Sequence, residues 1–250
     1  MARRINKRWK DGPPLPHGVV CRFTWKQFLL LMAVSLPGAW LYTSCEDPRR
    51  QHPVWGVDVS HHQGDIDWTR VRATGAAFAY VKVSEGRDHV DTRFRANLEQ
   101  ARAAGLKIGA YHYFTLCAPG REQAEHFVRT LGGLAPDLPP VADLEYAGNC
   151  ARRPGREELS REIDDFIAVV EQRLGRRPML YSTKSFASDH RLWDRPDLHQ
   201  WIRAIHTRPG FLGTRDWTFW QYRVGRVDGV AGPVDLNVFR GTAAELDGLR

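Results

Sequence analysis

The sequence predicts an α/β fold: an incomplete (β/α) TIM-like barrel of about five β/α units followed by three further strands. Two observations support this prediction. Between residues 55 and 182, short apolar runs alternate with helical patterns across short loops, which favours a parallel sheet with right-handed crossovers. From residue 183 onward strand-like runs continue, but the segments between them have too little apolar periodicity for full helices.

The strands are predicted from short apolar runs bounded by turn residues. The run 77–83 is apolar on both faces, as expected for a strand that is covered on both sides. The run 139–146 opens with two prolines and is followed by Gly148 and Asn149, which mark a loop. The other expected strands lie at residues 55–60, 107–113, 178–182, 201–204, 217–222 and 234–239.

Helical patterns fill the connections between the first five strands. Asp91 and Thr92 can cap a helix that runs to Ala104 and stops at Gly105. Large apolar side chains recur on one face from residue 159 to 174, where Gly175 closes the helix. Two further helices are expected at residues 66–71 and 120–131.

The strand within 139–146 ends in two carboxylates, Asp143 and Glu145. Side chains alternate along a strand, so both acids should point to one face with Cβ atoms roughly 7 Å apart. Like charges that close raise at least one pKa, which gives a protonated acid beside an ionised one near neutral pH. Hydrolysis of a glycosidic bond needs this pair. The alternative is that the acids cap a helix or pair with an arginine.

Other polar and aromatic residues fall at the predicted carboxyl ends of strands, where barrels of this kind carry their working residues. Trp220 and Tyr222 share one face of a strand and are the rings preferred for stacking on a sugar, while Gln221 points the other way. Glu85 can pair with Lys82 or bind sugar, and His112 can be a core or a pocket residue. The candidate substrate-binding residues are Tyr111, Tyr181, Trp220, Tyr222, Glu85 and His112.

The positive charge of the chain is concentrated at its N-terminus. Of the formal net charge of +7, residues 1–50 supply six, because they hold nine Lys and Arg residues and only three acids. The remaining part is nearly neutral and offers no basic stripe to a phosphate backbone, so we expect no nucleic-acid partner.

The basic N-terminal residues precede an apolar run, a pattern that keeps the basic end in the cytoplasm and exports the part of the chain after the run. We expect a basic cytoplasmic segment at 1–27, an apolar signal anchor or signal peptide at 28–43, a linker at 44–53 and one barrel domain at 54–250. Pro37, Trp40 and Tyr42 disfavour a cleavage site, so we favour an uncleaved anchor that tethers a periplasmic or other extracytoplasmic domain to the inner membrane. Cleavage with secretion, a lipid on Cys45 and a buried helix are the alternatives.

The cysteines and histidines indicate a disulfide and no cofactor. Cys117 and Cys150 each follow a predicted strand in the exported part, where an oxidising compartment permits a disulfide; two unpaired buried thiols are the alternative. His61 and His62 lie near Asp58 but lack a third ligand at a recognisable spacing, so no metal is predicted.

Seven sequence blocks in order, between about residues 55 and 241, resemble glycoside hydrolase family 25, the lysozymes or N-acetylmuramidases. The blocks are Gly56-Val-Asp-Val-Ser60 with Gln63-Gly64, Ile66-Asp-Trp68, Lys82-Val-Ser-Glu-Gly86, Gly109-Ala-Tyr-His112, Asp143-Leu-Glu145, Trp220-Gln-Tyr222 and Val234-Asp-Leu-Asn237. The resemblance implies a barrel that lacks its last helices, and a monomer that acts on the glycan strands of peptidoglycan.

The same resemblance implies cleavage of the β-1,4 bond between N-acetylmuramic acid and N-acetylglucosamine, without a cofactor. Glu145 would be the general acid, and Asp143 would position the substrate's N-acetyl group or stabilise the transition state. Asp58 and Asp235 would complete the acidic pocket. The family's W-x-A-x-Y is replaced here by Trp201-Ile-Arg-Ala-Ile205, and the insertion bearing Cys150 lies beside the acid pair. A peptidoglycan-binding module without catalysis and a metal-dependent deacetylase are the alternative functions.

Overall fold

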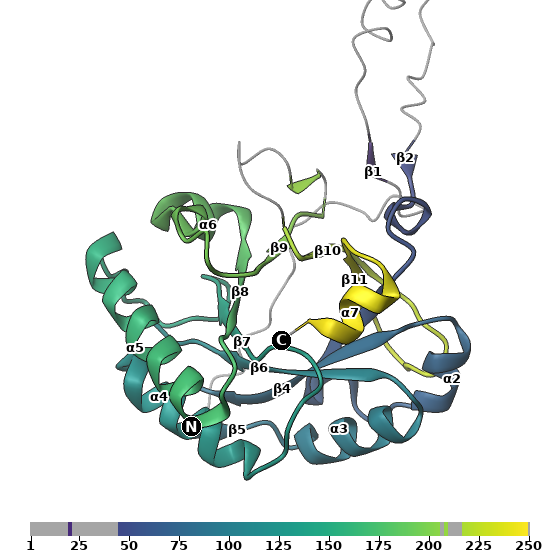
Figure 1. Cartoon of the computed structure of the whole chain (residues 1–250), viewed down its shortest axis with the longest axis horizontal. Helices are drawn as coiled ribbons and strands as arrows, with labels where there is room; N and C mark the ends of the chain where they lie inside the picture. The colour runs from purple at the N-terminus through teal and green to yellow at the C-terminus, as the bar shows by residue number, and fades with distance from the viewer. Residues whose placement is uncertain (1–19, 22–44, 206–207, 210–216, 250) are drawn as a thin grey trace, which may run out of the picture.

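The computed structural model describes residues 20–21, 45–205, 208–209 and 217–249. Its main sheet has the strand order β3-β11-β10-β9-β8-β7-β6-β4, and β3 also pairs with β4, so these strands close into a barrel (Figure 1). The two-residue strand β5, His89–Val90, is added at the edge of β4. The barrel strands are β3 Trp55–Val59, β4 Phe78–Glu85, β6 Lys107–Tyr113, β7 Val141–Leu144, β8 Met179–Thr183, β9 Gln200–Arg203, β10 Phe219–Gly225 and β11 Val234–Phe239.

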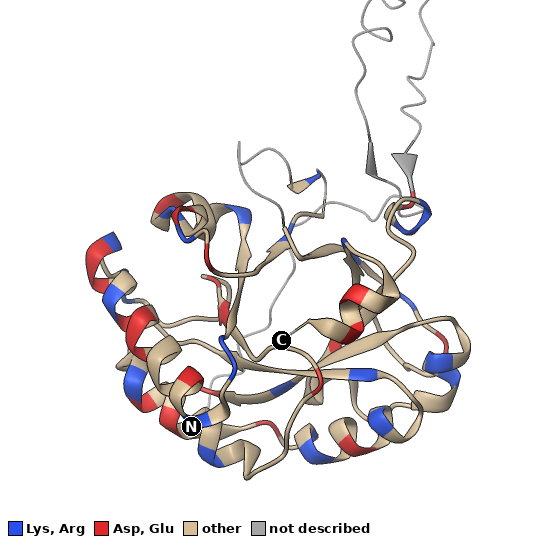
Figure 2. Cartoon of the chain, viewed as in Figure 1, with Lys and Arg blue, Asp and Glu red and all other residues tan. Residues whose placement is uncertain are grey.

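Helices cover the outside of the barrel, and both signs of charge are distributed over them (Figure 2). The expected helix 120–131 is confirmed as α4, and Gly175 ends α5 in a left-handed conformation, as predicted. The helices among the described residues are η1 Pro48–Arg50, η2 His61–Gln63, α2 Trp68–Ala73, α3 Phe94–Ala103, α4 Gly120–Leu131, α5 Arg156–Leu174, α6 Lys184–His190, η3 Leu192–Asp194 and α7 Ala243–Gly248.

The predicted incomplete barrel is confirmed, with one difference in strand direction. In the barrel, each neighbouring pair along the series β3, β4, β6, β7, β8, β9 and β10 is parallel. The last strand, β11, is antiparallel to both of its neighbours, β10 and β3. Residues 226–233 join β10 to β11 without a crossover helix, and a connection that short can only reverse the chain. The start of β11 therefore lies at the same end of the barrel as the carboxyl ends of the parallel strands.

Two short helices were not expected from periodicity. Thr183 caps α6 by accepting the Phe186 N–H, and Thr242 forms a reciprocal capping box with Glu245 at the start of α7. The spacing Thr242-x-x-Glu245 is a readable helix signal, although the helix after it has only one buried side chain, Leu246.

The helix expected from Asp91 begins later, at Phe94. The Asp91 carboxylate accepts the Arg93 N–H at 2.9 Å, but it also accepts the His61 N–H at 2.9 Å from the loop after β3. Asp91 therefore joins two loops and does not cap the helix.

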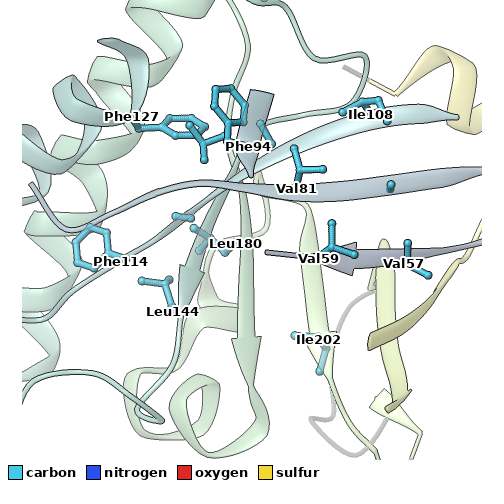
Figure 3. Packing of buried hydrophobic residues seen from close by; sticks show 14 of the residues in the cluster. Val57, Val59, Val81, Phe94, Ile108, Phe114, Phe127, Leu144, Leu180 and Ile202 are labelled. Atoms are coloured by element: carbon cyan, nitrogen blue, oxygen red, sulfur yellow. The ribbon is translucent and has the colours of Figure 1, made fainter. Parts of the chain in front are cut away.

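The core has two layers because strand side chains alternate between the barrel interior and the helices. The outer layer lies between sheet and helices; Val57, Val81, Ile108, Leu144 and Leu180 belong to it (Figure 3). The inner layer fills the barrel at the amino ends of the parallel strands and is largely aromatic. It includes Phe78, Tyr80, Val141, Met179, Tyr181, Trp201, Phe219 and Phe239. Because this layer fills the interior at the amino ends of the parallel strands, a substrate would approach from their carboxyl ends, the mouth of the barrel.

Two glycines make room for the inner aromatic layer. Gly109 lies beside Tyr80 in the β4–β6 register, and a Cβ there would be 2.0 Å from the Tyr80 ring. Gly56 lies beside Phe78 in the same way, and its Cβ would be 2.2 Å from the Phe78 carbonyl oxygen. Any larger residue at either position would push a ring out of the inner aromatic layer, which lies directly beneath the mouth of the barrel.

The predicted membrane segment at 28–43 lies outside the described residues, as does nearly all of the basic segment 1–27. The strands β1 Val20–Cys21 and β2 Cys45–Glu46, which precede and follow residues 28–43 in the sequence, pair antiparallel. Over the ranges that are described, we find no helix with the length and apolar character needed to span a bilayer.

Candidate active site

Four acidic residues meet at the open end of the barrel. Asp58 is near the end of β3, Asp143 is near the end of β7, and Glu145 is one residue beyond that strand. Asp235 comes from the beginning of β11, not from a strand's carboxyl end as expected, because β11 is antiparallel. The β3–β11 register places Asp235 directly beside Asp58.

The carboxylate of Asp58 is held by two amides. Asn237 Nδ2 donates to Asp58 Oδ1 at 2.7 Å, and Gln221 Nε2 donates to the same oxygen at 3.3 Å. Burial raises the pKa of Asp58 well above its usual value, the charge of Asp235 raises it further, and the two amides oppose the rise. The surroundings of Asp58 therefore stabilise its protonated form more than water stabilises that of an exposed aspartate.

Asp143 is buried between two tyrosines on neighbouring strands, Tyr113 on β6 and Tyr181 on β8. Its Oδ1 is buried without a hydrogen-bond partner in the described part of the chain. Burial raises the pKa of Asp143 well above its usual value, and the charge of Glu145 adds to the rise, while Lys82 opposes it. The predicted rise is present, but desolvation is the larger cause. A buried acceptor with no protein partner is suited to a ligand's N–H or O–H.

Glu145 is half-buried, and its main chain is fixed by the loop after β7. Asn149 Nδ2 donates to the Glu145 carbonyl at 3.0 Å, and the Tyr113 hydroxyl donates to the Ala147 carbonyl at 2.7 Å. The charge of Glu145 raises the pKa of Asp143, Tyr113 and Tyr181. These effects place its carboxylate at the same mouth.

Comparison with known proteins agrees with this geometry. Residues 57–230 match the family model described as glycosyl hydrolases family 25. The chain belongs to this family. The resemblance noted in the sequence is thereby confirmed, and the match covers most of the described barrel.

Individual relatives give the same result. Lysozyme M1 of Streptomyces globisporus is 38% identical over 211 residues, which cover 77% of this chain and 70% of that protein. The bacterial lysozyme of Streptomyces coelicolor superposes with a TM-score of 0.71 at 37% identity, over 78% of this chain and 96% of that one. A family 25 glycosyl hydrolase from Bacillus anthracis gives a TM-score of 0.73 at 36% identity, over 79% and 94% of the two chains.

Two aromatic candidates lie in the core of this family 25 domain, so that part of the sequence prediction is wrong. Trp220 and Tyr222 are each 1% exposed and belong to the outer layer. The Trp220 indole donates to the Ala204 carbonyl at 2.8 Å. Because Gln221 between them faces Asp58, alternation turns both rings away from the mouth, and neither presents a face to a sugar.

His112 is also a core residue and not a pocket residue. Its ring is fully buried and packs against the rings of Phe127 and Phe166. Its two nitrogens make hydrogen bonds, Nδ1 with the Ser84 hydroxyl at 2.9 Å and Nε2 with Gln123 Oε1 at 3.3 Å. Burial lowers the pKa of His112 to about 3, so the ring is neutral at physiological pH. The remaining ring candidates, Tyr111 and Tyr181, are on the inner face of the sheet.

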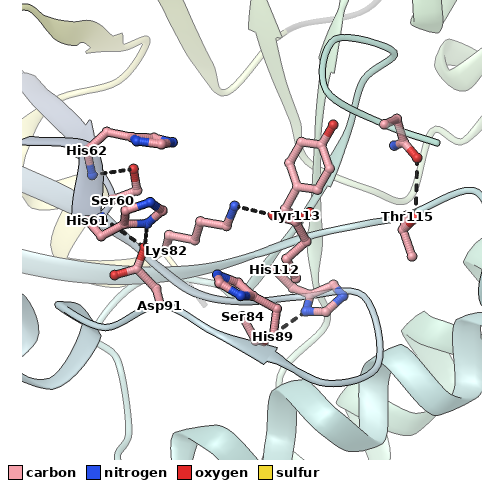
Figure 4. Close-up of polar contacts among 12 residues, drawn as sticks. Ser60, His61, His62, Lys82, Ser84, His89, Asp91, His112, Tyr113 and Thr115 are labelled. Carbon is pink, nitrogen blue, oxygen red and sulfur yellow. Dashed lines mark hydrogen bonds and ion pairs between the residues drawn. The ribbon is translucent and has the colours of Figure 1, made fainter. Parts of the chain in front are cut away.

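Cationic side chains at the mouth were not chosen from the sequence as site residues. Lys82 Nζ pairs with Glu85 Oε2 at 2.7 Å and lies 4.8 Å from the centre of the Tyr113 ring (Figure 4). The ion pair that the sequence left open against sugar binding is therefore formed. Arg203, two residues after the inward-facing Trp201, lowers the pKa of Asp235 by its charge. Both Lys82 and Arg203 lie on the inward-facing side of their strands, near the carboxyl ends. Extending the alternation of inward and outward side chains to the end of each strand would have identified them.

A histidine group forms one side of the same region (Figure 4). The buried Asp91, 2% exposed, accepts the backbone N–H of His61 at 2.9 Å and contacts His61 Nδ1 at 2.8 Å. The rings of His62 and His89 are 4.0 Å and 6.3 Å from that of His61. Within the described ranges, no group of three or more His, Cys, Asp or Glu side chains has an arrangement able to hold a metal ion.

Asp235 should make the stability of the protein depend on pH. Burial raises its pKa from 3.8 to about 6, so between these values the folded state binds more protons than the unfolded state. This stabilisation is complete below pH 3.8 and is lost as the pH rises through 6. We expect Asp235→Asn to raise the free energy of unfolding, relative to the parent, by on the order of 2 kcal/mol more at pH 7 than at pH 4.

Urea titrations at the two pH values would measure this difference. The matched control is Asp88→Asn, an exposed acid in the β4–β5 turn. An equal gain for Asp235→Asn at both pH values would show that the carboxyl of Asp235 is not buried as described.

The predicted disulfide is confirmed. Cys117 and Cys150 are bonded, with Cα atoms 6.2 Å apart, and join the loop after β6 to the loop after β7. Asn149 reinforces the connection, because its Oδ1 accepts the Leu116 N–H at 2.8 Å while its Nδ2 donates to the Phe114 carbonyl at 2.8 Å. The loop that carries Glu145 is thus tied to its neighbour covalently and by hydrogen bonds.

Removing this disulfide should destabilise the protein. With a sequence separation of 33 between the cysteines, the double variant Cys117→Ser/Cys150→Ser should lose about 4 kcal/mol of unfolding free energy, because the unfolded chain gains freedom. The measurement is thermal unfolding with and without dithiothreitol. Reductant should lower the Tm of the parent and leave that of the variant unchanged; an equal decrease in both would assign the effect to other cysteines.

Proposed function

We propose that this protein is an N-acetylmuramidase that cuts the β-1,4 bond between N-acetylmuramic acid and N-acetylglucosamine in peptidoglycan. The observation that carries the proposal is the buried Oδ1 of Asp143, which has no hydrogen-bond partner among the described residues and lies next to the half-buried Glu145 at the mouth of the barrel. Relatives named lysozyme and N,O-diacetylmuramidase support the same substrate class.

In the proposed reaction Glu145 is the general acid. Its proton passes to the glycosidic oxygen as the bond from that oxygen to C1 of the muramic acid breaks, so that the leaving sugar departs as a neutral alcohol. In the second half of the reaction Glu145, now ionised, takes a proton from the water that attacks C1. The half-buried position of Glu145 gives the departing sugar and the incoming water access to it.

Asp143 has two candidate roles in this scheme. Its Oδ1 can accept the acetamido N–H of the muramic acid, which turns the acetamido oxygen toward C1 so that this oxygen forms the temporary bond that water later breaks. Alternatively, the ionised carboxylate stabilises the positive charge that develops on the ring. The unpartnered oxygen favours the first role, since it is an acceptor already placed for an N–H donor.

Product analysis tests the function. Purified full-length protein would be incubated with peptidoglycan, and the products would be reduced with borohydride and analysed by mass spectrometry. A muramidase leaves muramic acid at the new reducing ends, so muramitol should appear. Glucosaminitol would indicate cleavage of the other glycosidic bond, and binding to peptidoglycan without new reducing ends would indicate a wall-binding module.

The proposed place of action is outside the cytoplasm, where peptidoglycan lies. The basic residues 1–27 and the apolar run 28–43 support an N-terminal tether to the membrane, and the disulfide supports an oxidising compartment. We propose that the domain acts there as a monomer. Fractionation of cells expressing the full chain should recover it with membranes, and deletion of residues 28–43 should abolish that association.

A further inference from the structure

Two hydrogen-bond chains cross the inside of the barrel and end on the same atom, Oδ1 of Asp58. In the first, Trp201 Nε1 donates to Asn237 Oδ1 at 2.9 Å, and Asn237 Nδ2 donates to Asp58 at 2.7 Å. In the second, the Tyr181 hydroxyl donates to Gln221 Oε1 at 2.8 Å, and Gln221 Nε2 donates to Asp58 at 3.3 Å. The strands β8, β9, β10, β11 and β3, neighbours in the barrel, each supply one of these residues.

The two aromatic donors fix the direction of the amides. The indole of Trp201 can only donate, so the oxygen of the Asn237 amide must face it and the nitrogen must face Asp58. The Tyr181 hydroxyl can donate or accept, and here it donates to Gln221 Oε1, which favours the same direction of the Gln221 amide. All four side chains are buried, so water is not there to replace a lost donor.

The orientation of the amides determines where Asp58 can hold a proton. An oxygen that accepts two N–H groups has both of its lone pairs engaged, so the proton of the protonated acid belongs on Oδ2. An amide turned by 180° would instead present its oxygen to Asp58, which would repel the ionised carboxylate and favour a proton on Oδ1. The indole of Trp201 prevents this turn in Asn237, and the Tyr181 hydroxyl opposes it in Gln221 by donating to Oε1.

We propose that Trp201 and Tyr181 are positioning residues, which act through Asn237 and Gln221 to keep the proton of Asp58 on Oδ2 and so fix the edge that this acid presents to the substrate. The inference rests on the proposed muramidase function, because the edge matters to turnover only if Asp58 faces a bound glycan. It adds to that function two aromatic residues that act on Asp58 through its amide donors.

Variants of the aromatic donors test the proposal. Tyr181→Phe removes a single oxygen atom, and Trp201→Phe removes the indole N–H. Each should lower kcat about tenfold with little change in KM, the size expected when a buried amide oxygen is left without its hydrogen-bond donor. Because the amide donors lower the pKa of Asp58, each variant should also move the pH profile of kcat to higher pH.

Tyr80→Phe is the matched control. Tyr80 belongs to the same inner layer, its ring lies 4.8 Å from that of Trp201, and its hydroxyl donates to the Pro139 carbonyl at 3.3 Å, outside both chains. This variant also loses one buried hydroxyl, but should keep the pH profile of the parent. Equal shifts in Tyr80→Phe and Tyr181→Phe, or no shift in Tyr181→Phe and Trp201→Phe, would overturn the proposal.

A measurement without substrate separates the inference from the function. The carboxyl carbon of Asp58, labelled with carbon-13 and assigned with Asp58→Asn, would be titrated by NMR in the parent and the variants. A raised Asp58 pKa in both aromatic variants, but not in Tyr80→Phe, supports the positioning role even if no reducing ends form. An unchanged pKa in both overturns it even if the parent is an active muramidase.

Discussion

Glu145→Gln is expected to lower kcat on peptidoglycan by a factor of about 10² to 10⁴. The amide has the shape of the carboxyl group but cannot give a proton to the glycosidic oxygen, and proton transfer by a positioned side chain contributes about 10² to 10⁴ in rate. Release of new reducing ends, followed over time, measures the loss. Binding to insoluble peptidoglycan should stay close to that of the parent, because the substitution is isosteric.

A control acid on the outer helices tests whether position matters. Glu171 is exposed on α5, and Glu171→Gln should retain full activity. If Glu145→Gln released reducing ends as fast as the parent, Glu145 would not be the proton donor and the mechanism would have to be assigned to another acid at the mouth.

Asp143→Asn should reduce kcat by roughly 10² to 10³, the range found when one electrostatic partner of a transition state is removed. An amide at this position has one acceptor oxygen and no charge, so it holds an acetamido N–H less strongly and cannot stabilise positive charge. The two proposed roles of Asp143 predict different substrate dependence. If it orients the acetamido group, a glycan lacking the N-acetyl group should be a poor substrate for the parent and lose little more in the variant.

The same substitution should stabilise the folded protein at neutral pH. Because burial raises the pKa of Asp143, the folded state binds more protons than the unfolded state above the usual carboxyl pKa, and the acid's contribution to stability is lost as the pH rises through its folded pKa. Asp143→Asn removes this loss, so its Tm at pH 7 should exceed that of the parent. A variant with lower Tm and lower activity would indicate that Asp143 is structural.

Periodicity and motif spacing predicted most of the fold. The strands Lys107–Tyr113 and Val234–Phe239 have the expected bounds, since alternating apolar side chains and flanking turn residues define them locally. The antiparallel direction of β11 follows from the short connection after β10. Helix α7 was not predicted from periodicity, because its sequence signal is a capping box and not an apolar stripe.

The aromatic candidates show where local reasoning ends. Trp220 and Tyr222 lie on one face of their strand, as expected. The sequence of a single strand, however, does not determine which of its two faces points into the barrel. That choice comes from closure of the whole sheet, which brings Gln221 on β10 to Asp58 on β3 across the one strand between them, β11. Once one residue of a regular stretch of strand is placed, alternation places its neighbours.

The sequence by itself determined the family, the order of strands and helices, and the four acids, because these depend on local pattern and on residue identity. The tertiary structure alone decided which side chains share the mouth, that burial raises the pKa of Asp58 and Asp143, and which amides and rings hold Asp58. The physical reason is that desolvation and hydrogen bonding depend on neighbours far apart in the chain, such as Asp58 and Asn237, which only closure of the barrel brings into contact.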